Sequence, residues 1–448
     1  MIKKKSLWQL ELAMFLLAVL LLTTPTQAIA DSSPDEIVTV ELLTVKEPRS
    51  DAESKLRVIR LTTRAGESGY GDYLDYGLPA ANAEEVLRRL VDRYAKQGYR
   101  KNIFLTDPSM RAVGGGQKVI GMTATQVLHV AKEEWFPGRA FFSRDGLGTI
   151  WQGPGKSALI IALETALRDL TGEIGTSDTR ICPTLSFALE QDGRRRLRTP
   201  QEMQEAVASL RRAGFSVVRL DLARSLDEAM KSRGEIPPYR YPQEILGELK
   251  RLVAASKSAA GTEMDMVVSA DTNLSSDGMT YLALHCQRNG VSLLENPMAM
   301  RHLSEQGHAR KEFKQAIGFG GDYHTLEDFA QGIQVKAGTV LVPDCGRIGG
   351  VSMLSQAADL AKDARLKIAP VVRGGPLSLL AVASSLSQSE ELLWVTAPYA
   401  EEWFKNDGLL KTPLRLNQGR LTSQACELDT TKFQSKQIAE IKIKDKEG

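Results

Sequence analysis

The second half of this chain alternates short apolar runs with longer helical patterns, and this alternation constrains its fold more than any other feature. From about Arg180 onward, the apolar runs predict eight strands, at residues 181–186, 216–221, 266–270, 291–295, 316–319, 339–343, 367–371 and 392–396. Helical patterns fill most of the intervals, at residues 200–213, 242–256, 278–289, 326–334, 352–363 and 376–386. Strands and helices that alternate in this way favour an α/β fold built as a parallel (β/α) barrel.

A doubly wound open sheet is the alternative for such a pattern. That fold commonly binds a dinucleotide through a Gly-x-Gly-x-x-Gly turn after a strand. No such turn follows any of the eight predicted strands. The barrel is therefore the preferred architecture.

The first half of the chain has a different pattern. Residues 36–46 and 57–64 are rich in β-branched side chains and predict two strands of a small sheet. Residues 69–77, rich in Gly, Tyr and Asp, are expected to form a loop between this sheet and a helix over 82–98. A second helix is expected over roughly 155–171. A sheet followed by helices makes an α+β unit.

Charged side chains follow several of the predicted barrel strands, where a barrel carries its chemistry. Arg219 and Asp221 are two residues apart on the second strand, so both point into the barrel mouth. The candidates at the ends of later strands are Asp271, Glu295, Asp322 and Asp344. Neighbouring carboxylates repel one another unless a positive group lies among them. A divalent cation such as Mg²⁺, which prefers oxygen ligands, meets this need, and Arg219 is the alternative.

Five segments, in this order, resemble the enolase superfamily, specifically its mandelate racemase and muconate-lactonizing branch with the sugar-acid dehydratases. They are Asp271-Thr272-Asn273, Glu295-Asn296-Pro297, residues 317–329, residues 343–351 and residues 370–381. The resemblance implies a modified barrel over 176–399. It also implies an α+β capping domain over 31–175 that the tail, 400–448, completes.

The resemblance also implies an active site. In that family, carboxylates on the third, fourth and fifth strands hold Mg²⁺, which stabilises an enediolate after a base removes the α-proton of a carboxylate substrate. Asp271 and Glu295 match the first two ligands. The third position falls on Gly321, and Asp322 stands next to it, so the metal set is written as Asp271, Glu295 and Asp322.

The usual bases of the family are replaced. Its Lys-x-Lys on the second strand corresponds to Arg219 and Asp221, and arginine stays protonated at neutral pH. Asp344 matches the aspartate of a His–Asp pair, but the histidine position holds Val371. His324 is the nearest substitute along the chain. The candidate catalytic residues are therefore Asp221, Arg219 and Asp344, with Arg219 also able to bind a carboxylate.

Two functions stay open at this point. One is a Mg²⁺-dependent dehydratase or racemase that acts on a carboxylate such as an acid sugar. The other is a non-catalytic binding protein on the same scaffold, which has lost the third metal ligand and both usual bases. The expected partner in either case is a small carboxylate compound. A homo-oligomer is allowed for, and no nucleic acid is expected.

The amino terminus predicts export. Residues 3–5 are lysines, Leu12 to Leu22 is an uninterrupted apolar run, and the small-residue site Ala28-Ile29-Ala30 follows. This order is typical of a secretory signal peptide over 1–30, and the apolar run is shorter than the roughly 20 residues of a membrane span. The alternative is an uncleaved membrane anchor. Export would place the chain in the periplasm or outside the cell.

Net charge and cysteines exclude some classes of partner. The 57 basic and 55 acidic residues give a net charge of +2, which creates no field for binding a polyanion. The four cysteines, Cys182, Cys286, Cys345 and Cys426, have long and irregular spacings that favour no zinc cluster. Export permits disulfides, but the spacings do not select a pairing, and free buried thiols are equally consistent.

Overall fold

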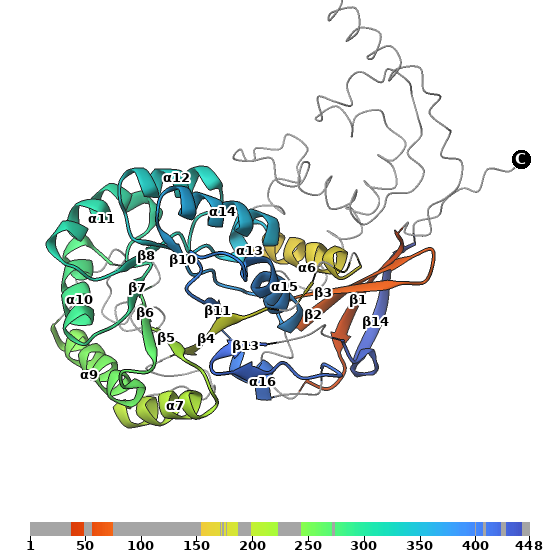
Figure 1. Cartoon of the computed structure of the whole chain (residues 1–448), viewed down its shortest axis with the longest axis horizontal. Coiled ribbons are helices and arrows are strands. Elements are labelled where there is room, and N and C mark those ends of the chain that lie inside the picture. The colour runs from red at the N-terminus through yellow and green to blue at the C-terminus, as the bar shows by residue number, and fades with distance from the viewer. Residues whose placement is uncertain are drawn as a thin grey trace, which may run out of the picture.

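The structure is a computed structural model. It describes residues 37–48, 56–74, 154–170, 172, 174–175, 177–186, 199–222, 243–270, 274–398, 400–405, 409–422 and 427–440. Figure 1 shows a barrel of alternating strands and helices beside a smaller antiparallel sheet. This arrangement confirms the predicted α/β class with a modified barrel and an α+β capping domain.

Eight parallel strands form the barrel, because each apolar run places one face on the barrel interior and the other beneath the helices. Each strand pairs with the next in parallel register from β4 to β10, and β11 pairs with β4. The strands are β4 (Thr179–Ser186), β5 (Val217–Asp221), β6 (Asp265–Ser269), β7 (Leu293–Glu295), β8 (Ile317–Phe319), β9 (Val340–Leu341), β10 (Lys367–Ile368) and β11 (Val395–Ala397).

The barrel closes through isolated bridges between its last two strands. Ile368 is bridged to Leu392, and Val371 is bridged to Thr396, so β10 lies beside β11. With β11 paired to β4, the eight strands form a complete ring. Regular pairing is shorter than predicted at several strands, above all at β9 and β10, but every predicted strand overlaps an observed one.

Helices surround the ring, as Figure 1 shows. All six predicted barrel helices are confirmed as α7 (Pro200–Arg212), α9 (Gln243–Ala260), α10 (Ser276–Arg288), α12 (Leu326–Gln334), α14 (Val351–Asp363) and α15 (Pro376–Leu386). Six shorter elements were not predicted. They are the helices α11 (Leu303–Ala309), α13 (Cys345–Ile348) and α16 (Ala400–Lys405), and the 3₁₀ turns η2 (Met300–His302), η3 (Arg310–Glu312) and η4 (Thr430–Lys432). Elements this short lack a measurable period in the sequence.

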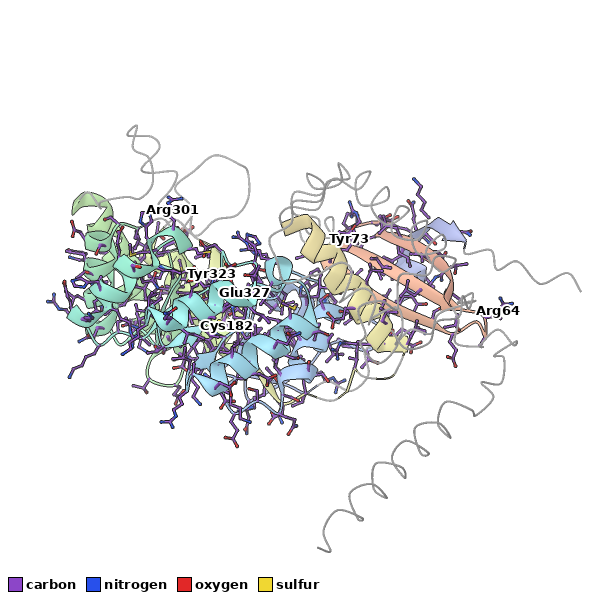
Figure 2. The ribbon with its side chains drawn as sticks, turned by 90° about the horizontal axis from the view of Figure 1, so that it is seen from above. Arg64, Tyr73, Cys182, Arg301, Tyr323 and Glu327 are labelled. Atoms are coloured by element: carbon purple, nitrogen blue, oxygen red, sulfur yellow. The ribbon has the colours of Figure 1, made fainter. Side chains whose placement is uncertain are left out.

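The barrel interior is mostly apolar below its mouth. Side chains from five of the strands and from residues next to or just beyond β9, β10 and β11 form one buried cluster: Cys182, Val217, Val267, Leu293, Val340, Val342, Ala369, Val371 and Trp394. Figure 2 shows Cys182 among the barrel elements, below Arg301, which follows β7 at the upper edge in this view. Polar chemistry is thereby confined to the ends of the barrel.

The smaller sheet has the order β14-β1-β2-β3, and all of its pairs are antiparallel. Its strands are β1 (Ile37–Val45), β2 (Leu56–Thr63), β3 (Ser68–Leu74) and β14 (Phe433–Glu440). The last strand comes from the far end of the chain. A two-stranded hairpin, β12 (Leu416–Asn417) and β13 (Arg420–Leu421), extends the barrel sheet beside β4. The domain limits given above stay predictions.

The prediction of a loop over residues 69–77 is wrong for residues 69–74, the part that the structure describes. Residues 68–74 form strand β3, and the helix α6 (Pro154–Leu170) lies directly on it, as Figure 2 shows beside Tyr73. A Cβ atom at Gly69 or Gly71 would stand 2.2 or 1.9 Å from a carbonyl oxygen of α6. The glycines therefore allow close packing of helix on sheet and do not mark a loop at residues 69–74. Residues 75–77 and the predicted helix over 82–98 lie outside the described residues.

Asp72 fastens the small sheet to the barrel. Its buried carboxylate accepts hydrogen bonds from the backbone N–H groups of Gly375, Leu377 and Ser378, at 3.0, 2.7 and 2.9 Å. These groups lie at the start of α15, where a helix has N–H groups without internal partners. Burial raises the pKa of the Asp72 carboxyl, and the hydrogen bonds from α15 oppose the rise.

A second buried carboxylate joins the same two parts. Glu164 on α6 accepts hydrogen bonds from the backbone N–H of Ser352 at 2.9 Å, from the Ser352 hydroxyl and from Arg168. Ser352 lies at the start of α14. Both contacts fix the capping domain against the barrel helices, which sets the position of any group that it places over the barrel mouth.

Two smaller expectations are answered within the described residues. Cys182, Cys286 and Cys345 are buried free thiols, and burial raises the pKa of each. None of the described helices is long and apolar enough to cross a membrane. Cys426 and the predicted signal peptide, residues 1–30, lie outside the described residues.

Candidate functional site

The barrel brings together several of the predicted site residues at the carboxyl ends of its strands. Arg219 and Asp221 stand on β5, and Glu295 ends β7. Between them, Ser269 of β6 is in register with both Asp221 and Glu295. This register follows from the strand lengths, because parallel neighbours end at the same edge of the barrel. Asp271 follows β6 but lies outside the described residues.

Arg219 and Glu295 form a buried ion pair across the top of the barrel. Arg219 Nε lies 3.1 and 3.0 Å from the two carboxylate oxygens, and Nη2 lies 3.0 Å from Oε1. Nη2 also donates to the Ser269 hydroxyl at 2.7 Å, and Nη1 lies 3.7 Å from an Asp221 oxygen. The side chains of Arg219 and Glu295 are only 8% and 1% exposed. Both oxygens of the predicted metal ligand are therefore held by a guanidinium.

Asn296 fills the position of the predicted third ligand. Its Nδ2 donates to Glu295 Oε1 at 3.2 Å, and its Oδ1 accepts from the backbone N–H of Gly321 at 2.9 Å. A Cβ atom at Gly321 would stand 2.3 Å from Asn296 Nδ2 and 2.8 Å from its Cγ. Asn296 is buried and has a φ of 46°, a conformation that asparagine tolerates better than most residues. Sequence reasoning did not assign Asn296 a role.

Asp322, the neighbouring candidate, is engaged with the chain. Its Oδ2 accepts a hydrogen bond from the backbone N–H of Met300 at 2.9 Å. Met300 begins η2, in the connection that follows β7. This contact ties the segment after β8 to the segment after β7.

The described residues do not fit a Mg²⁺ ion. Mg²⁺ needs several oxygen ligands at about 2.1 Å, whereas Glu295 is occupied by Arg219 and position 321 carries no side chain. In the described part of the chain, no three His, Cys, Asp or Glu side chains are grouped so as to hold a metal. We therefore derive no chemical step through a metal.

Asp344 forms a second charged cluster on the other side of the mouth. Its Oδ2 pairs with Arg373 Nε and lies 3.8 Å from Arg347 Nε, and its Oδ1 accepts from the Gly346 N–H at 2.9 Å. The Arg347 and Arg373 side chains are 26% and 36% exposed, while Asp344 is 2% exposed. Sequence reasoning missed both arginines, because it searched for a histidine partner of Asp344.

Neither Val371, at the family's histidine position, nor its nearest substitute, His324, is placed to transfer a proton. Val371 occupies the family position and is part of the apolar cluster inside the barrel. His324 is exposed, and its backbone N–H donates to Asp328, which closes a capping box with Thr325 at the start of α12. Asp221, the remaining catalytic candidate, lies beside Arg219 at the mouth, and its side chain is 28% exposed.

Comparison with known proteins decides the family. The profile of enolase C-terminal domain-like proteins matches residues 202–426, which is half of the chain. This chain belongs to the enolase superfamily, in its mandelate racemase and muconate-lactonizing branch. No curated protein matches it by sequence.

Solved structures agree on the fold. A mandelate racemase/muconate lactonizing enzyme-like protein from Rubrobacter xylanophilus DSM 9941 has a TM-score of 0.66 at 16% identity, over 89% of this chain and 97% of that one. A candidate dehydratase from Zymomonas mobilis ZM4 has a TM-score of 0.67 at 16% identity, over 90% and 99%. A mandelate racemase/muconate lactonizing enzyme from Jannaschia sp. CCS1 has a TM-score of 0.65 at 17% identity, over 89% and 96%. At these identities, the likeness concerns the fold.

Proposed function

We propose that this chain is a metal-independent binding protein for small organic acids, built on an enolase-superfamily barrel. The observation that carries the proposal is the Arg219–Glu295 pair. The guanidinium supplies the positive charge that the carboxylate would otherwise obtain from Mg²⁺, and it holds both carboxylate oxygens. A protonated arginine at the position of the family's lysine base also removes a group that could take an α-proton.

Two arginines support an acidic ligand. Arg347 and Arg373 lie at the mouth, beside Asp344 and partly exposed to solvent. Guanidinium groups bind carboxylates with paired, charge-assisted hydrogen bonds. In this proposal they contact the carboxylate of the ligand, and Asp221 across the mouth accepts a hydrogen bond from a ligand hydroxyl. The predicted export places this binding activity in the periplasm or outside the cell.

A matched pair of compounds tests the proposal. D-gluconate and D-glucitol have the same carbon chain and differ in one carboxylate, so calorimetric titration of the full chain isolates recognition of that group. Other acid sugars are screened alongside, first in EDTA and then with Mg²⁺ in excess over the EDTA. Binding of an acid but not of its alcohol, unchanged by adding Mg²⁺, is the expected result.

The competing function is the Mg²⁺-dependent dehydratase or racemase. It is favoured by family membership and by the Asp271 and Glu295 positions in the sequence. Its signature is exchange of the α-proton of an acid sugar in D₂O, followed by NMR. Exchange that requires Mg²⁺ and disappears in Asp271→Ala would replace our proposal with this function.

A further inference from the structure

We infer that Asn296 is a positioning residue that closes the third metal-ligand position and holds Glu295 on Arg219. The absence of a side chain at Gly321 is then only part of the change in this site. Arg219 and Asn296 together take over the space and the charge that a metal ion and its third ligand would need. This inference concerns the interior of the site and stands whether or not the chain binds an organic acid.

The first step is steric. The carboxamide of Asn296 lies where a side chain at position 321 would begin, since a Cβ there would be 2.3 Å from Nδ2, 2.8 Å from Cγ and 3.1 Å from Oδ1. Three atoms of one group are therefore in conflict with a single added carbon. Gly321 is not among the residues with positive φ, so its backbone does not itself demand glycine.

The second step concerns hydrogen bonds. The same carboxamide accepts from the Gly321 N–H and donates to Glu295 Oε1. Asn296 and Glu295 are both nearly inaccessible to water, at 4% and 1% exposure. A side chain at 321 would push the carboxamide away and leave the partly buried N–H of Gly321 and the buried Glu295 carboxylate each short of one partner. Position 321 and Glu295 are therefore coupled through Asn296.

The third step concerns charge. Glu295 has its oxygens bonded to Arg219 and its Oε1 bonded to Asn296 as well. A cation that approached Glu295 would have to displace a guanidinium, which is held in addition by Ser269. Adding a carboxylate at 321 alone cannot achieve this. We expect a metal to enter only when Arg219, Asn296 and Gly321 are all changed.

The coupling is tested by a double-mutant cycle on the full chain, with urea unfolding as the measurement. Gly321→Ala should lower the folding equilibrium constant by about 10-fold or more, because it removes buried hydrogen bonds. In an Asn296→Gly background, which keeps the positive φ accessible, Gly321→Ala should cause little further loss. An equal loss in both backgrounds would overturn the inference.

Gly318 supplies the matched control. It lies on β8, the strand that ends just before Gly320 and Gly321, and a Cβ there would meet a methyl group of Val342 at 2.6 Å. Gly318→Ala should destabilise the chain to the same extent with and without Asn296. Coupling of Gly318→Ala to Asn296→Gly as strong as that of Gly321→Ala would contradict a specific role for the carboxamide.

A spectroscopic measurement distinguishes a positioning role of Asn296 from a contribution to stability alone. Mn²⁺ binding, followed by electron paramagnetic resonance, should be absent in Gly321→Glu and in Asn296→Gly/Gly321→Glu, and present in Arg219→Lys/Asn296→Gly/Gly321→Glu. Mn²⁺ binding by either of the first two, or its absence from a folded triple variant, would overturn the inference. Failure of the unaltered chain to bind any acid sugar would instead overturn the proposed function and leave this inference standing, so the two failures are distinct.

Discussion

The two ends of the barrel carry the same kind of ion pair in two different environments. At the mouth, Arg219 of β5 reaches Glu295 of β7, and at the opposite end Arg180 of β4 reaches Asp265 of β6 at 2.6 Å. Each pair spans one intervening strand, and each has serine partners, Ser269 at the mouth and Ser216 and Ser292 at the other end.

The difference between the pairs is burial. The mouth pair is 8% and 1% exposed, whereas the opposite pair is 25% and 40% exposed. A buried charge without its partner costs far more than an exposed one, because water cannot replace the lost contact. Loss of one partner should therefore destabilise the chain far more at the mouth than at the opposite end.

The largest expected effect comes from Arg219. Arg219→Met should destabilise the chain by about 3–5 kcal/mol, because it leaves Glu295 buried without a cation. The measurement is the free energy of unfolding in urea. Arg219→Met combined with Glu295→Leu should recover most of this loss, and a double variant as unstable as the single one would contradict the explanation.

A third carboxylate sharpens the comparison, because its donors are neutral. Asp72 is buried like Glu295 but is held by three backbone N–H groups of α15. Asp72→Ala should cost about 2–3 kcal/mol, since charged hydrogen bonds are lost and the N–H groups stay buried. Asp169→Ala is the control, because the described partner of its carboxylate is a single N–H, that of Tyr70. A larger loss in the control would show that the contact between α15 and β3 is not what Asp72 stabilises.

The opposite end of the barrel should respond weakly. Arg180→Ala should cost at most about 1 kcal/mol, in the range of exposed ion pairs. Part of that loss comes from the Trp394 ring, whose centroid lies 5.8 Å from the guanidinium carbon. A loss as large as that of Arg219→Met, measured in the same urea series, would break the comparison between the two ends.

The smallest effect is a change in pH dependence. Asp265 is partly buried, which would raise the pKa of its carboxyl, but the bonds from Arg180 and Ser292 outweigh this and the pKa is lowered. A lowered pKa in the folded state gives stability that is present above the unfolded pKa and is lost as the pH falls through the folded one. Asp265→Asn should flatten the acid limb of the curve of stability against pH. An unchanged acid limb would show that the Arg180 contact does not perturb Asp265.

Much of the fold could be predicted because the signal for it is local. An apolar run and the helical period after it occupy adjacent residues, so all eight barrel strands and six of their helices were found. The small sheet was harder to predict, because Gly69 and Gly71 are residues typical of a turn. In the structure they lie in β3, where they allow the close approach of α6. That contact joins segments far apart in the chain, so no periodic pattern in the sequence reveals it.

The sequence predicted where the site residues lie on the strands, but not which residues they contact. The sequence indicated Arg219 and Glu295 at the ends of the second and fourth predicted strands, and it allowed Arg219 as the positive group. It could not show that the two residues, 76 apart in the chain, are joined by hydrogen bonds from both Nε and Nη2 of the guanidinium. Asn296, Arg347 and Arg373 were missed because their partners, Gly321 and Asp344, were compared with the family's third metal ligand and its His–Asp pair. The role of Asp271 and the cleavage of residues 1–30 stay predictions.

One measurement tests the central claim most directly: isothermal titration of the unaltered full chain, first freed of metal with EDTA and then dialysed, with Mg²⁺ and with Mn²⁺. Since Arg219 already occupies both oxygens of Glu295, we predict no saturable binding of either ion at millimolar concentration. Saturable binding of one ion per chain that is lost in Glu295→Gln would show that Arg219 yields to a metal, and would contradict this account.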